Sequence, residues 1–77
     1  MATAPKNPQP PNSESFKVEF EQEKDGRWLA EIPELPGVMA YGPTKRDAEV
    51  AVVALALRVL ADRTEQHKKP PRSIQFL

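Results

Sequence analysis

The sequence predicts an α+β fold in which one long helix packs across a small antiparallel sheet, with the elements in the order β-β-β-α-β. Three observations carry this prediction. Apolar and polar residues alternate with period two on both sides of an Asp-Gly pair, which is typical of a β-hairpin. The run from Val50 to Ala61 is typical of a helix that is apolar almost all the way round. A proline pair then ends the helix before a last short apolar segment.

The chain is long enough for a single domain. Residues 1–14 contain four of the nine prolines and no apolar run, so we expect a disordered tail there and a folded domain over residues 15–77. That tail has the features of neither a signal peptide nor a membrane span, which favours a cytoplasmic protein. The chain has no cysteine, so neither a disulfide nor a thiolate metal site can support its small core.

The first two strands are predicted over residues 16–21 and 27–32, joined by a turn at Asp25 and Gly26. Pro33 ends the second strand because it lacks a backbone N–H group. Alternation places six apolar side chains on the inner face of this hairpin. They are Phe16, Val18, Phe20, Trp28, Ala30 and Ile32.

A proline-bounded loop at residues 33–37 leads to a short third strand at residues 38–41. Thr44 is a suitable N-cap for the helix that follows, and Asp47 stands where a capping box has glutamate or glutamine. The last apolar segment, residues 74–77, is expected to form a fourth strand. It either returns to the sheet of its own chain or adds to that of a neighbouring subunit.

The helix is predicted from Lys45 to about Gln66. A stripe at helical spacing is assigned to the sheet, and further apolar residues widen the surface beyond what a small sheet covers. We therefore expect self-association, as a dimer or a larger oligomer. The predicted sheet-facing stripe is Ala48, Val52, Leu55 and Val59, and the predicted oligomer interface is Val53, Leu57 and Leu60.

Charge is balanced over the whole chain, with 11 basic and 11 acidic residues, which argues against direct binding of nucleic acid. Its distribution is uneven, because residues 14–34 hold seven acids and three bases, a balance of −4. Residues 58–77 hold five bases and two acids, a balance of +3. The acidic region is either a surface for a basic partner or a solvated face.

Residues that carry enzymatic chemistry are scarce. His67 is the only histidine and falls at the predicted end of the helix among charged neighbours, where a surface role is expected. Three glycines in turn positions form no phosphate-binding loop. The sequence therefore favours a protein that is not an enzyme and that uses no cofactor and no metal.

Two stretches, residues 25–37 and 42–48, resemble the HicB-like antitoxin family. The first reads DGRWLAEIPELPG and the second GPTKRDA. The resemblance implies a trimmed ribonuclease H-like domain without catalytic carboxylates. It also implies a partner, a small basic toxin that cleaves messenger RNA and whose active site the antitoxin covers. We expect the single-domain form, without the family's appended DNA-binding module.

The resemblance makes occlusion of a ribonuclease toxin the first functional hypothesis. The alternative is a self-associating structural or adaptor domain that has no toxin partner. The candidate toxin-binding residues lie on or near the predicted second and third strands, with two more glutamates on the first. They are Glu19, Glu21, Glu31, Glu34, Leu35 and Tyr41.

Overall fold

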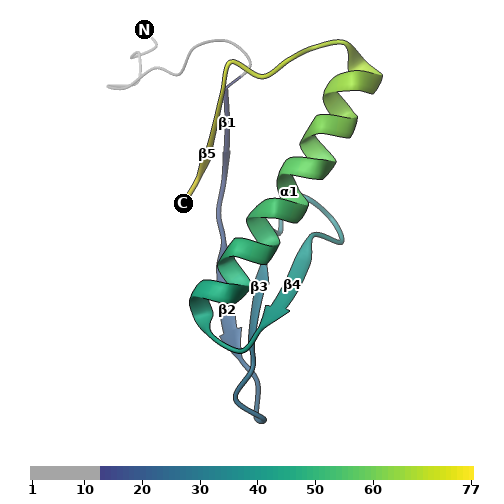
Figure 1. Cartoon of the computed structure of the whole chain (residues 1–77). Helices are drawn as coiled ribbons and strands as arrows, with labels where there is room; N and C mark the ends of the chain where they lie inside the picture. Colours follow the sequence, from purple (N-terminus) through teal and green to yellow (C-terminus); the bar gives the residue numbers. More distant parts are fainter. Residues whose placement is uncertain (1–12) are drawn as a thin grey trace, which may run out of the picture.

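The protein is described here over residues 13–77 of a computed structural model, and the predicted tail falls almost wholly outside the described residues. The predicted class is confirmed, since one helix packs across a small sheet (Figure 1). The order is β-β-β-β-α-β, because the predicted first strand is divided. The elements are β1 (Ser13–Phe16), β2 (Glu19–Gln22), β3 (Trp28–Glu31), β4 (Met39–Gly42), α1 (Lys45–His67) and β5 (Ser73–Phe76).

The domain starts earlier than the sequence predicts. Strand β1 begins at Ser13, so the predicted boundary after residue 14 is two residues too late. Only Lys17 and Val18 separate β1 from β2, and the two strands follow one another along the same side of the molecule (Figure 1). The segment over residues 13–22 therefore acts as one interrupted strand with a different partner for each half.

The two halves join different neighbours. Strands β2, β3 and β4 form an antiparallel sheet, whereas β1 pairs with β5 in parallel. The N–H of Val18 donates to the carbonyl of Leu77 at 2.8 Å, and the N–H of Leu77 donates to the carbonyl of Phe16 at 2.8 Å. The C-terminal strand thus pairs within its own chain, but with β1 in a separate two-stranded sheet and not at the edge of the three-stranded sheet. Helix α1 supplies the crossover that a parallel pair requires.

The core lies between α1 and the sheet. Helix residues at intervals of four are buried, and they meet inward-facing residues of the strands and of the loop before β4. The six predicted inner-face residues of the hairpin all belong to this core or pack against it. The buried helix residues are Ala48, Val52, Ala56 and Leu60.

Two assignments of helix faces need correction. Leu60, predicted at an oligomer interface, is buried in the core of its own chain, and Val53 packs against that core. Leu57, the third predicted interface residue, is exposed. Leu55 and Val59, predicted in the sheet-facing stripe, are only partly buried, while Ala56 is fully buried. The buried positions recur every four residues, so the covered stripe drifts around the helix relative to the 3.6-residue repeat.

The predicted N-cap is confirmed. The Oγ1 of Thr44 accepts a hydrogen bond from the N–H of Asp47 at 3.0 Å and donates to its Oδ2 at 2.9 Å. At the other end Lys68 adopts a left-handed conformation with φ of 58°, and its N–H donates to the carbonyl of Thr64. Both ends of α1 are thus closed by local hydrogen bonds, which satisfy backbone groups that a helix leaves unpaired.

Replacement of the cap, Thr44→Ala, is expected to lower the free energy of unfolding by about 1 kcal/mol, because the N–H of Asp47 loses its acceptor. Urea denaturation followed by circular dichroism measures this loss. Thr64→Ala is the matched control, since the Oγ1 of Thr64 bonds the carbonyl of Leu60 inside the helix and caps nothing. Equal losses in the two variants would contradict the capping role.

Candidate protein-binding face

One face of the three-stranded sheet is not covered by α1. Side chains alternate across a strand, so the residues between those that pack on the helix point to this face. The register brings Glu19, Glu31 and Met39 into one row across the sheet and Glu21, Leu29 and Tyr41 into the next. We call these six residues the open face.

Three carboxylates dominate the open face. Glu19 lies directly opposite Glu31 in the β2–β3 register, and Glu21 is two residues further along β2. Their side chains form no ion pair and no hydrogen bond within residues 13–77. Like charges directly opposite on neighbouring strands destabilise a sheet. The open face therefore carries a repulsion that a cation from outside the chain would relieve.

The acidic residues surround a shallow hollow of about 230 Å³, lined mainly by Glu19, Glu21, Leu29 and Glu31. The surface of this hollow is mostly polar, and Leu29 adds a small apolar part to it. A hollow of this kind fits a long basic side chain, whose stem would contact Leu29 while its charge meets the carboxylates.

Exposed apolar side chains adjoin the carboxylates on β4. Met39 and Tyr41 are both exposed although they are large and hydrophobic. The guanidinium of Arg27 lies over the Tyr41 ring, 4.7 Å from its centroid, and bonds Asp25 at 2.8 Å. The backbone N–H of Arg27 and the Arg27 side chain both donate hydrogen bonds to the Asp25 carboxyl. These bonds, the backbone one most strongly, lower the pKa of Asp25 below its ordinary value. Arg27 is thus held in place beside Tyr41.

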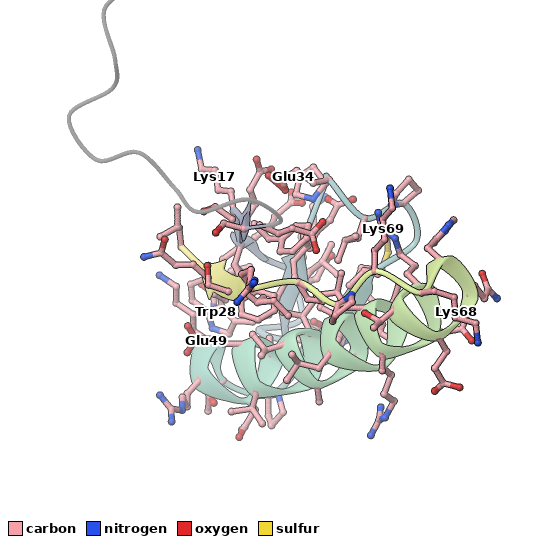
Figure 2. All side chains as sticks on the ribbon, turned by 90° about the horizontal axis from the view of Figure 1, so that it is seen from above. Lys17, Trp28, Glu34, Glu49, Lys68 and Lys69 are labelled. Atoms are coloured by element: carbon pink, nitrogen blue, oxygen red, sulfur yellow. The ribbon has the colours of Figure 1, made fainter. Side chains whose placement is uncertain are left out.

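The six predicted binding residues do not all come together. Glu19, Glu21, Glu31 and Tyr41 lie on the open face. Glu34 lies in the loop after β3, beside Lys17 (Figure 2), and its Oε2 accepts a hydrogen bond from the backbone N–H of Lys17 at 3.2 Å.

Leu35 was wrongly predicted as a contact residue, because it is buried in the core. The loop turns back on itself through two hydrogen bonds, from the N–H of Leu35 to the carbonyl of Ile32 and from the N–H of Val38 to the carbonyl of Leu35. This turn directs the Leu35 side chain inward. Sequence reasoning also missed Leu29 and Met39, although strand alternation could have placed both beside the glutamates.

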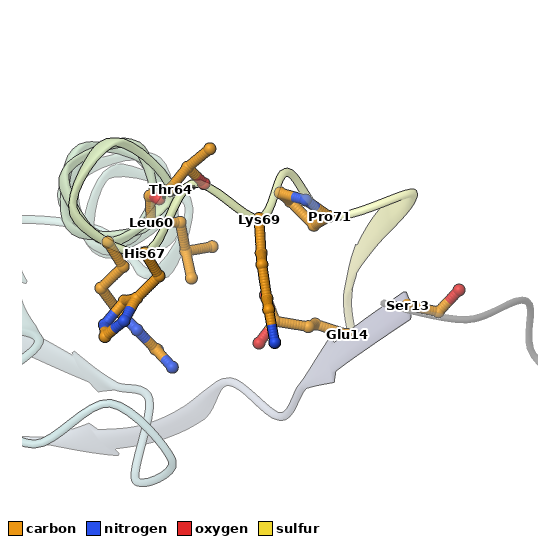
Figure 3. A pocket seen from close by; sticks show the side chains of 8 residues that line it. Ser13, Glu14, Leu60, Thr64, His67, Lys69 and Pro71 are labelled. Carbon is orange, nitrogen blue, oxygen red and sulfur yellow. Dashed lines mark hydrogen bonds between the residues drawn. The ribbon is translucent and has the colours of Figure 1, made fainter.

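His67 lies in a second hollow of about 340 Å³ between the C-terminal end of α1 and the β1–β5 pair (Figure 3). Arg63 and Lys69 also line it, together with Glu14 on β1. Within residues 13–77 no group of three or more histidine, cysteine, aspartate or glutamate residues is placed to hold a metal ion. No helix in that range is long and apolar enough to cross a membrane.

No protein-family model, curated protein or solved structure matches the chain. The candidate face is therefore defined by its own geometry and charge.

Proposed function

We propose that the chain is a non-catalytic binding module whose open face receives a basic protein, and that this partner is a small ribonuclease toxin whose active site it occludes. The observation that carries the proposal is the facing pair Glu19 and Glu31, whose carboxylates form no ion pair within residues 13–77. The resemblance to HicB-like antitoxins supports the identity of the partner. Because the substrate of such a toxin is messenger RNA, we propose that the chain acts in the cytoplasm.

The chemistry of such a partner suits the open face. A protein that cleaves RNA holds phosphates with lysine and arginine, so its active surface is positively charged. Carboxylates on the open face would take the place of those phosphates and would attract the partner over a distance. Tyr41 and Met39 would supply the apolar contacts on which affinity depends, since buried aromatic residues contribute strongly to binding at interfaces.

Removing the facing charges, Glu19→Gln with Glu31→Gln, is expected to weaken binding by about tenfold or more, equivalent to at least 1.4 kcal/mol. The same change should raise the stability of the free chain slightly, because a cross-strand repulsion disappears. Opposite effects on binding and stability separate a contact role from a structural one.

The partner for this experiment is obtained by affinity purification of the tagged chain from its native cell, followed by calorimetry with the purified partner. Asp62→Asn with Glu65→Gln is the matched control, because it removes two charges from exposed positions of α1. Affinity that is unchanged by the open-face variant, or reduced equally by the control, would contradict the proposal.

Self-association as a structural or adaptor domain is the second candidate function. It is favoured by Val50 and Leu57, which are 55% and 46% exposed on α1 although both are large and apolar. The neighbouring reading frame in the genome distinguishes the candidates. A short basic protein with a single histidine supports the toxin partner, and its absence favours self-association alone.

A further inference from the structure

The side of α1 that faces away from the core is apolar in its middle. Val50, Ala54, Leu57 and Ala61 recur at intervals of four, three and four residues, which places them on one side of a helix. The buried residues Ala48, Val52, Ala56 and Leu60 occupy the opposite side. We call the first four residues the outer stripe. Within the described part of the chain, about half of the surface of Val50 and of Leu57 stays exposed.

We propose that the outer stripe pairs with the outer stripe of a second copy of this chain, with the two helices antiparallel and a two-fold axis passing near Ala54. The order of side-chain sizes supports this arrangement. Ala54 lies between Val50, four residues before it, and Leu57, three residues after it. A two-fold axis near Ala54 sets Val50 of each copy against Leu57 of the other, and the small Ala54 lets the helices approach closely.

Charges beside the stripe select the antiparallel direction. Asp47 and Arg58 are 11 residues apart, about three turns, so they lie on the same flank of the outer stripe. In an antiparallel pair, the flank of one helix that carries Asp47 and Arg58 lies against the same flank of the other helix. The two-fold axis near Ala54 then brings Arg58 of each copy beside Asp47 of the other. In a parallel pair these two residues would be about 16 Å apart along the axis. Arg58 forms no ion pair within residues 13–77, so it is available for this contact.

Pairing through α1 leaves the open face of each copy directed outward, since the helix and the open face lie on opposite sides of the sheet. The dimer would then present two acidic faces. Under the proposed function, on which this step depends, two chains bind two basic partners. The pairing itself does not depend on that function.

Sedimentation equilibrium of the full chain at about 100 µM tests the pairing, because a weak dimer is populated at that concentration. Wild type should be dimeric, and Leu57→Lys should weaken the dimer by about tenfold or more while the circular dichroism of the helix is unchanged. Tyr41→Lys is the control on the open face and should leave the dimer intact. A monomeric wild type, or an intact dimer in the Leu57→Lys variant, would overturn the proposal.

The antiparallel direction is tested by mixing two charge variants. In a dimer of the Arg58→Glu variant two carboxylates meet in each contact, and in a dimer of the Asp47→Lys variant two cations meet. Each variant alone should therefore dimerise about threefold less tightly or worse. An equimolar mixture should restore the dimer, because both contacts of the mixed pair are then complementary. Arg46→Glu mixed with Asp47→Lys is the control, since Arg46 lies on the other flank of the stripe and should restore nothing. A mixture no more dimeric than its components would overturn the antiparallel arrangement.

Discussion

Val52→Asp is expected to leave the chain largely unfolded at 25 °C. Val52 lies in the middle of α1 with 0% of its surface exposed, packed within the core between the helix and the sheet. Within residues 13–77 no polar or charged residue is buried, so a new carboxylate would find no partner there. An unpaired buried charge costs about 3–5 kcal/mol, or the group is forced to take up a proton.

That cost is decisive because the domain is small. Stabilities of about 0.05–0.15 kcal/mol per residue give a chain of this length only about 4–12 kcal/mol in all. Small domains fall toward the lower end, since they bury a smaller fraction of their surface. The loss at Val52 is therefore comparable with the whole free energy of unfolding.

Circular dichroism and urea denaturation measure this effect, and Val50→Asp is the matched control. It makes the same chemical change two residues earlier in the same helix, at a side chain that is 55% exposed. At a dilution where self-association contributes nothing, Val50→Asp should change the free energy of unfolding by about 0.5 kcal/mol or less. A folded Val52→Asp variant with stability equal to the control would contradict the assignment of the two helix faces.

The strands of the hairpin could be predicted because their signal is local. Alternation from Phe16 to Ile32 shows which side chains share a face, and the six inner-face residues that it predicts all belong to the core or pack against it. Strand β1 could not be found in this way. Ser13 and Glu14 carry no apolar alternation, and they are ordered by pairing with Ser73 and Ile74, about 60 residues later in the chain. Partners so distant in sequence leave no local pattern.

The helix could be predicted in extent but not in orientation. Thr44 and the proline pair mark its ends, whereas valine, leucine and alanine occur on all its sides. Leu57 and Leu60 are the same residue type one turn apart, yet only Leu60 is buried. Which of them meets the sheet depends on how the chain leaves β4. That geometry is set by the packing of Gly42 against the first turn of α1, which the sequence does not express.

Gly42→Ala is expected to destabilise the domain by about 1–3 kcal/mol through overpacking at this junction. Gly42 ends β4, and a Cβ atom there would lie 2.5 Å from the backbone N of Ala48 and 2.8 Å from the backbone C of Asp47. These are backbone atoms of the first helical turn, so the new methyl group is accommodated only if the start of α1 moves away from the sheet. Such a movement would also disturb the cap that Thr44 forms with Asp47.

Two comparisons make this prediction specific. Gly26→Ala adds the same methyl group with nothing within 4 Å, and its cost of about 1–2 kcal/mol comes only from the positive φ of 93°. In Gly42→Ala the destabilisation should instead be coupled to the cap. Once the helix start has shifted, Thr44→Ala should cost less than it does in the wild type, so that the two losses do not add. Urea denaturation of the single and double variants measures this coupling, and strict additivity would show that Gly42 does not position the first turn of α1.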